Sequence, residues 1–312
     1  MHIVIYKNAQ LPALRYGGTE RVIWSLGKAL TRMGHRVTLL CAEGSASPFA
    51  EVKIYDPTQP FANQLPSDAD LVHFHDVIPQ GFDARPFVTT VHGNIGQGEP
   101  LPPMAIFVSH NHAARHGATH YVCNGLDWDD YPRPELDLPR SHFHFLGKAA
   151  WKVKNLHGAI RVVDRVPGGR LEVLGGTRLN FKMGFRLTLN PHVHFHGMVD
   201  DRAKQHYICR SRGLVFPVLW DEPFGLALTE SLYYGAPVFG TPRGSLPEIV
   251  TPEVGFLSAN EETLAKGIAE AIQHQTYSPR RCHEYAAERF NADVMARAYV
   301  QHYEAALNGE RW

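Results

Sequence analysis

Two glutamates eight positions apart lie in the stretch of the sequence whose side chains are best suited to bind a ligand. Glu222 and Glu230 belong to residues 220–240, which read WDEPFGLALTESLYYGAPVFG. Pro223 suits the first turn of a helix and Gly235 suits its end, so the pattern predicts a helix over 223–234. On one helix the two carboxylates would lie roughly 80° apart and would contact different parts of a ligand. A surface helix with two solvated acids explains the spacing equally well.

The segments around this helix determine where the two glutamates would lie. The apolar runs 213–218 (GLVFPV) and 237–241 (PVFGT) predict buried strands. A strand–loop–helix–strand unit places the N-terminus of its helix at the carboxyl edge of a parallel sheet. Unpaired N–H groups and a partial positive charge at that end suit a phosphate group. We therefore expect Glu222 at the mouth of such a site, with Glu230 two turns further along, beside a neighbouring diol.

Strand-like and helix-like segments alternate along the whole chain, which indicates parallel sheets covered by helices. The acidic, proline-rich stretch 127–139 has no periodicity and predicts a linker. The expected fold is α/β, with Rossmann-like doubly wound domains at 1–138 and 139–290. Two closing helices are expected at 279–290 and 292–307. The remaining strands are expected at 2–6, 36–42, 71–75, 87–92, 106–109, 121–123, 143–147, 171–175, 193–196 and 255–257.

The composition excludes several classes of function. Lysine and arginine number 31 and aspartate and glutamate 31, so the chain has no uniformly basic surface for nucleic acid or membranes. No apolar run reaches about 18 residues, and the chain starts with a strand-like segment instead of a signal peptide, which indicates a cytoplasmic protein. The four cysteines, Cys41, Cys123, Cys209 and Cys282, are widely spaced. Cys41 and Cys123 end apolar strand-like runs, which indicates buried, reduced thiols instead of a disulfide framework.

Two groups of histidines and two Asp-x-Asp pairs have to be considered as metal ligands. The histidines are His110, His112, His116 and His120, and His192, His194 and His196. Neither group has a cysteine or carboxylate at ligand spacing, so we expect no zinc site. The pair at 68–70 precedes a predicted strand and would lie at the amino end of the sheet, away from the ligand-binding edge. The pair at 127–129 begins the linker. We expect no metal at any of these positions.

Glycines, histidines and lysines follow other predicted strands. Gly17 and Gly18 precede a helix with apolar residues on a helical period, and they allow a ligand close to the backbone, although they also fit an ordinary turn. His92 ends a predicted strand on the ligand-binding edge. The segment 145–160 reads FLGKAAWKVKNLHGAI, a strand followed by a basic loop. Its lysines either bind an anion or are simply solvated.

The motif E-P-F-G-L-x-L-x-E followed by G-A-P-V resembles the signature of the retaining GT-B glycosyltransferases of family 4. Other motifs of that family occur in the same order over nearly the whole chain, from G-G-x-E at 17–20 and T-x-H-G at 90–93 to P-E-I-V at 247–250. This chain departs from the family motifs at three positions. Cys123 replaces the usual proline, Lys148 the usual arginine and Ser245 the usual glycine. Lysine offers a point charge instead of a bidentate fork, so the change at Lys148 reduces geometric precision. The resemblance also implies that 291–312 crosses back to the N-terminal domain.

The resemblance implies a role for each candidate residue. Glu230 would hold the ribose of a nucleotide-diphosphate sugar, with Met198 near the base. Lys148 and Lys154 would bind the diphosphate, with Lys152 as the alternative second cation. Asn155 follows Lys154 and a helix continues from there, which favours Lys154. The sugar would face Glu222 and the backbone of Phe224, Gly225 and Leu226. The residues expected on the acceptor side are Gly17, Gly18 and His92, and His92 would act in catalysis near the donor sugar.

The implied reaction is transfer of a sugar to an acceptor hydroxyl with retention at the anomeric carbon, without a cofactor or a divalent metal. The expected partners are the donor and a glycan or small-molecule acceptor, with a membrane surface added if the acceptor is a lipid. Nucleic acid is not expected. The rivals are a GT-B epimerase, a pyridoxal-phosphate phosphorylase, for which no Schiff-base lysine is evident, and an inactive homologue that binds nucleotide sugar as a partner subunit. The short N-terminal domain and Lys148 in place of the usual arginine keep the last of these open.

Overall fold

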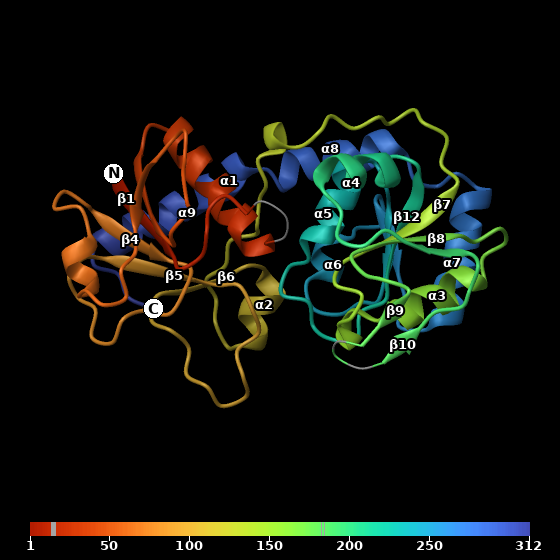
Figure 1. Ribbon diagram of the computed structural model, residues 1–312, viewed down its shortest axis with the longest axis horizontal. Coiled ribbons are helices and arrows are strands. Elements are labelled where there is room, and N and C mark those ends of the chain that lie inside the picture. The colour runs from red at the N-terminus through yellow and green to blue at the C-terminus, as the bar shows by residue number, and fades with distance from the viewer. Residues whose placement is uncertain (14–16, 182, 184) are drawn as a thin grey trace. The chain divides into compact units, whose positions relative to one another are not determined.

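The computed structural model describes residues 1–13, 17–181, 183 and 185–312 and contains two compact units (Figure 1). Unit 1 comprises Met1–Trp128 together with Phe290–Trp312, and unit 2 comprises Asp129–Arg289. Residues 14–16, which belong to the connection before the first helix, lie outside the described residues. Within the described part of the chain, no helix is long and apolar enough to cross a bilayer.

Unit 1 contains a six-stranded parallel sheet in the order β3-β2-β1-β4-β5-β6. The helix α9 packs against α1 and β5. An aromatic cluster around Tyr6, Phe61 and Phe74 fills one face of the sheet. The strands are β1 (His2–Lys7), β2 (Arg36–Cys41), β3 (Glu51–Ile54), β4 (Leu71–Phe74), β5 (Phe87–Val91) and β6 (Ala105–Phe107). The helices are α1 (Gly18–Arg32), η1 (Phe61–Gln64), α2 (His110–Arg115) and α9 (Ala292–Leu307).

Unit 2 contains a second six-stranded parallel sheet in the order β11-β8-β7-β12-β13-β14, and a separate two-stranded hairpin of β9 and β10. Figure 1 shows α3 and α7 together on one face of the sheet and α4, α5 and α8 on the other. The strands are β7 (His142–Leu146), β8 (Leu171–Leu174), β9 (Leu179–Asn180), β10 (Arg186–Leu187), β11 (Val193–Phe195), β12 (Ser211–Phe216), β13 (Val238–Gly240) and β14 (Gly255–Leu257). The short turn η2 (Trp128–Asp130) contains the last residue of the first segment of unit 1 and the first two residues of unit 2. The helices of unit 2 are η3 (Lys152–Lys154), α3 (Leu156–Asp164), α4 (Asp201–Ile208), α5 (Leu226–Tyr233), α6 (Leu246–Ile249), α7 (Glu261–Gln273) and α8 (Pro279–Arg289).

The predicted α/β class with two Rossmann-like parallel sheets is confirmed, and one predicted strand is wrong. Residues 121–123 form no strand, because Tyr121 makes only an isolated bridge to Phe107 at the end of the short edge strand β6. Cys123 is consequently only partly buried, whereas the other three cysteines are buried, and all four are free thiols. The short strand β3 and the hairpin were not anticipated from the sequence, since their side chains are largely exposed.

The strand order defines one switch point in each sheet, where successive strands are added on opposite sides. In unit 1 it lies between β1 and β4, and in unit 2 it lies between β7 and β12. In open α/β sheets, ligands bind outside the carboxyl ends of the strands at such points. The loops after these four strands therefore decide what each unit can bind.

Candidate functional site

The loops after β7 and β12 meet beside the switch point of unit 2. The backbone N–H of Leu219 donates to the carbonyl of Val153 at 2.8 Å, and the side chain of Asn155 donates to the carbonyl of Pro217 at 2.8 Å. Asn155 also caps α3, since its side-chain oxygen accepts the N–H of Gly158 at 3.0 Å. The turn η3 and this cap place Lys154 against the β12 loop.

Lys154 and Glu222 form an ion pair in this arrangement. The Nζ of Lys154 lies 2.6 Å from Oε2 of Glu222, and the two side chains are 13% and 8% exposed. The indole N–H of Trp220 donates to the same carboxylate oxygen at 2.8 Å. The ammonium group also lies 5.0 Å from the centroid of the Trp220 ring. The ammonium group of Lys154 is thus largely desolvated and lies next to an aromatic ring. A cation in such surroundings interacts strongly with a ligand anion that takes the place of Glu222 or binds beside it.

The helix that follows is shorter than the sequence pattern predicts. α5 begins at Leu226, and not at Pro223, because Gly225 adopts a left-handed conformation with φ 87° and acts as the N-cap. Glu222 therefore lies in the loop, and the predicted 80° separation on one helix does not apply. Gly225 provides no side-chain cap, so the first N–H groups of α5 remain available at this edge of the sheet.

A second loop holds the Glu222 segment in place. A Cβ at Gly244 would lie 2.2 Å from the backbone nitrogen of Glu222, so only glycine fits there. The N–H of Ser245 donates to the carbonyl of Glu222 at 2.9 Å, and its hydroxyl donates to the carbonyl of Phe224 at 2.6 Å. Ser245, where the family motif has a second glycine, thus fixes the backbone of the loop through its side chain.

Glu230 is buried and paired with a lysine that the sequence analysis did not single out. The Nζ of Lys204 lies 2.6 Å from Oε1 of Glu230 and 3.2 Å from Oδ1 of Asp201. Glu230 is 6% exposed and Lys204 9%. The sequence does contain a signal that could have identified Lys204. It lies one helical turn before the apolar Ile208, and this spacing puts the lysine on the buried face of α4. The two glutamates therefore have different cationic partners.

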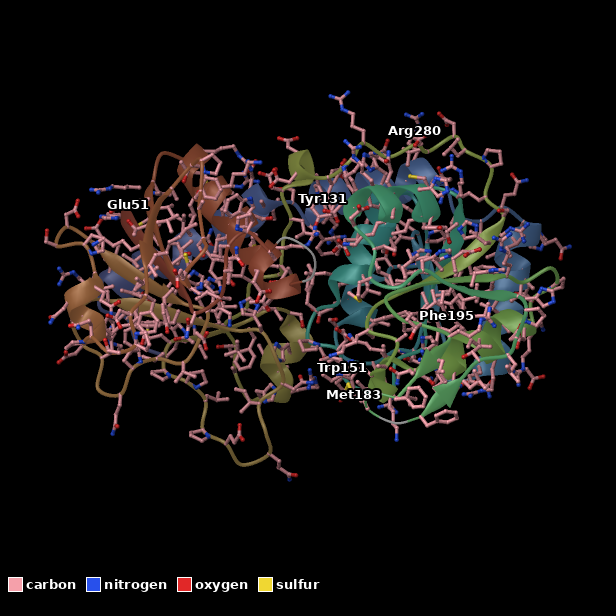
Figure 2. The ribbon with its side chains drawn as sticks, viewed as in Figure 1. Glu51, Tyr131, Trp151, Met183, Phe195 and Arg280 are labelled. Carbon is pink, nitrogen blue, oxygen red and sulfur yellow. The ribbon has the colours of Figure 1, made fainter. Side chains whose placement is uncertain are left out.

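The remaining candidates of unit 2 follow β7 and β11. Lys148 is exposed, and its Nζ lies 5.6 Å from the ring of Trp151, a residue that Figure 2 labels. Lys152 is also exposed. Met198, 54% exposed, follows the bridge between Gly176 and Gly197 that joins the loops after β8 and β11. Phe224 is buried, and Leu226 is half-buried.

In unit 1, Gly17 is the N-cap of α1 and Gly18 is its first residue, as the pattern predicts. A Cβ at Gly17 would lie 2.4 Å from a carboxylate oxygen of Glu20, so the side chain of Glu20 covers this glycine. The helix ends at Arg32, and Met33 is its exposed C-cap.

His92 lies at the end of β5 beside His75, which follows β4. The Nδ1 of His75 and the Nε2 of His92 are 2.8 Å apart, and both residues line a pocket of about 490 Å³ together with the ion pair of Lys7 and Asp76 (3.1 Å). Burial, and then the positive charge of Lys7, lowers the pKa of His92 to about 3. Burial likewise lowers the pKa of His75 well below its usual value. Both rings are therefore neutral at pH 7 and act through hydrogen bonds.

Several of the residues considered as metal ligands have structural partners. His196 Nε2 contacts Glu172, and His112 Nε2 lies 3.1 Å from the carbonyl of Gly93. The residues that the structure describes contain no group of three or more His, Cys, Asp or Glu placed to hold a metal. Asp68 and Asp70 contact His2 at the amino ends of β1 and β4, where the sequence predicted them.

Two family models match the chain. The model for "Glycosyl transferases group 1" matches residues 134–289, and the model for "Glycosyltransferase Family 4" matches residues 16–129. The "Uncharacterized 41.2 kDa protein in cps region" of Klebsiella pneumoniae is 30% identical over 117 residues, which are 36% of this chain and 32% of that protein. The match thus spans about a third of the length of this relative.

Several solved structures have the same fold. A glycosyltransferase involved in avilamycin A biosynthesis has a TM-score of 0.79 at 19% identity, covering 100% of this chain and 99% of that one. Sucrose-phosphate synthase from Thermosynechococcus elongatus has a TM-score of 0.74 at 18% identity, with coverage of 99% and 100%. HepE of Anabaena, solved with UDP and glucose, has a TM-score of 0.70 at 16% identity, with coverage of 98% and 100%. At these identities the likeness establishes the GT-B fold.

Proposed function

The chain belongs to the group 1 glycosyltransferases, and we propose on that basis that it moves a sugar from a nucleotide-diphosphate sugar to an acceptor hydroxyl with retention at the anomeric carbon. The observation that supports the proposal is a pair of buried carboxylate–lysine contacts in unit 2. Lys154–Glu222 joins the loops after β7 and β12, beside the switch point where such sheets bind ligands, and Lys204–Glu230 joins α4 to α5.

Each side chain has a distinct part in the proposed reaction. Glu230 binds the ribose with the oxygen that Lys204 does not contact, and the backbone near Met198 contacts the base. Lys154, assisted by Lys148 and the N–H groups of α5, offsets the charge of the departing diphosphate. Glu222 and the backbone from Phe224 to Leu226 face the sugar, and Glu222 keeps Lys154 oriented until the donor binds. The Anabaena neighbour, solved with UDP and glucose, is compatible with a donor of this class.

The pocket of unit 1 is proposed to receive the acceptor. It presents the Lys7–Asp76 pair and the neutral His92. Among the described residues, the buried Nε2 of His75 has no hydrogen-bond partner, and burial without one is costly. A hydroxyl of the acceptor would supply that partner. We propose that the reaction uses no cofactor and no divalent metal, because the cations of unit 2 and the helix N-terminus provide the required positive charge.

Replacing Glu230 by glutamine should weaken the binding of the cognate nucleoside diphosphate by about 1.5–3 kcal/mol, the range for a hydrogen bond to a charged group. Titration calorimetry with UDP, GDP and ADP measures this difference. Glutamine preserves the size of the side chain, and the melting temperature reports whether the variant is folded. The matched control is Glu261→Gln, which changes a carboxylate of α7 that pairs with Arg161 and should leave the affinity unchanged. Unchanged affinity in a folded Glu230→Gln protein would remove Glu230 from the nucleotide site.

A further inference from the structure

The indole of Trp220 and the ammonium group of Lys154 contact the same oxygen of Glu222. The indole N–H donates to Oε2 at 2.8 Å, and the Nζ of Lys154 lies 2.6 Å from that atom. Within the described part of the chain, the other carboxylate oxygen, Oε1, accepts no hydrogen bond. A carboxylate has about four acceptor positions, so Oε1 is left for a hydroxyl of a ligand. Glu222 is therefore held through one oxygen by two donors, of which only one is charged.

The residues on either side of the β12 loop fix the position of this indole. The backbone N–H of Leu219 donates to the carbonyl of Val153 at 2.8 Å, which ties the residue before Trp220 to η3. The ring of Trp220 packs edge-on against Trp151, which Figure 2 labels, with the ring centroids 5.9 Å apart. A tryptophan side chain has only two side-chain torsions, so little conformational entropy is lost when it is packed in this way. The indole N–H is thus held beside the carboxylate.

The arrival of a diphosphate affects the two donors differently. The ammonium group of Lys154, which lies 5.3 Å from the centroid of Phe216 and 5.0 Å from that of Trp220, is the cation assigned to the diphosphate. A diphosphate carries more negative charge than one carboxylate, so it competes with Glu222 for this ammonium. The indole N–H is neutral and is attracted far less. When Lys154 binds the diphosphate, the indole therefore remains on Oε2.

We infer that Trp220 is a positioning residue that keeps Glu222 directed at the sugar after Lys154 has bound the diphosphate. The inference rests on the proposed function, because it concerns the same donor site. Without the indole N–H, the diphosphate would repel the carboxylate and displace it from the sugar. The indole has no charge to offer the nucleotide, so its loss should lower turnover and spare the affinity for the nucleoside diphosphate.

Trp220→Phe tests the inference, because phenylalanine keeps an aromatic ring against Trp151 and Lys154 but has no N–H. The probes are UDP-glucose, GDP-glucose and ADP-glucose at saturation, with water as the acceptor. Release of the nucleoside diphosphate should slow at least about tenfold, the effect of losing a hydrogen bond to a charged group. Titration calorimetry with the same nucleoside diphosphate should give an unchanged Kd. The matched control is Trp24→Phe, which changes an indole packed against Phe49 in unit 1 and should alter neither quantity.

A double variant shows whether the indole acts through the carboxylate. Glu222→Ala alone should lower turnover, and adding Trp220→Phe should lower it no further, because the indole N–H has then lost its acceptor. The melting temperature reports whether each variant is folded. If phenylalanine destabilises the fold, benzothienylalanine incorporated at position 220 keeps the shape of the indole and replaces only its N–H by sulfur.

The possible failures are distinct. Unchanged turnover in a folded Trp220→Phe protein, or losses that add in the double variant, would overturn the inference and leave the proposed function standing. The same holds if Trp220→Phe weakens the affinity for the nucleoside diphosphate at unchanged turnover. A wild type that binds none of UDP, GDP and ADP and turns over none of the three nucleotide sugars would contradict the proposed function, and the inference would fail with it.

Discussion

Replacing Lys154 by methionine should lower the turnover of the cognate donor at least tenfold, which corresponds to about 1.4 kcal/mol or more in activation free energy. Two causes act together. The departing diphosphate loses the cation nearest to the switch point, and the carboxylate of Glu222, which Lys154 contacts at 2.6 Å, becomes an uncompensated negative charge beside the leaving group. Methionine fills a similar volume and preserves the packing against Trp220. Release of the nucleoside diphosphate over time measures the rate.

Two further variants separate these causes. Lys154→Met combined with Glu222→Gln removes both charges and should recover part of the lost turnover, because the added repulsion disappears. Lys152→Met changes the exposed lysine two positions earlier and should have little effect. A large loss in Lys152→Met with none in Lys154→Met would show that the wrong lysine of η3 has been assigned to the diphosphate.

Replacing Lys204 by methionine should lower the free energy of unfolding by about 3–5 kcal/mol, the usual result of removing one partner of a buried ion pair. Glu230 would then be buried without its cation, since the Lys204 ammonium is the group that contacts Oε1. Adding Glu230→Gln should restore much of the lost stability by removing the isolated charge. Urea denaturation followed by circular dichroism measures both effects.

The control for Lys204 is Lys266→Met on α7. Lys266 is 77% exposed, and its Nζ lies 3.9 Å from Glu270, so this variant should change stability by less than about 1 kcal/mol. Equal and small effects at Lys204 and Lys266 would mean that the Lys204–Glu230 pair is well solvated in solution. In that case Lys204 would have no role in positioning Glu230 for the ribose.

Local features of the fold could be predicted from the sequence because they depend on neighbouring residues. Alternating apolar runs and helical periods identified the two parallel sheets. Gly17 and Gly18 marked the start of α1, and Asn155 marked the start of α3, because capping depends on a few adjacent residues. The sequence pattern places the start of α5 three residues early. A glycine at position 225 is compatible with either a turn or a helix, so the sequence alone does not reveal the left-handed conformation that makes Gly225 the N-cap.

The partners of the candidate residues could not be predicted in the same way. Lys154 and Glu222 are 68 positions apart, and Lys204 and Glu230 are 26 apart, so their contacts depend on the strand order of unit 2. The hydroxyl of Ser245 reaches the carbonyl of Phe224, 21 positions away, for the same reason. Sequence patterns identify an acid or a lysine on a particular face, whereas the fold decides which of them meet.

The most direct test of the proposed function is the melting temperature of the full chain with UDP-, GDP- and ADP-sugars in excess EDTA. A donor held by Lys154, Lys148 and Glu230 needs no divalent metal, so at least one nucleotide sugar should raise the melting temperature. At a concentration a hundred times its Kd it adds about 2.7 kcal/mol to the free energy of unfolding. Stabilisation that appears only after magnesium or manganese is added, or no stabilisation by any nucleotide sugar, would contradict the proposed donor site.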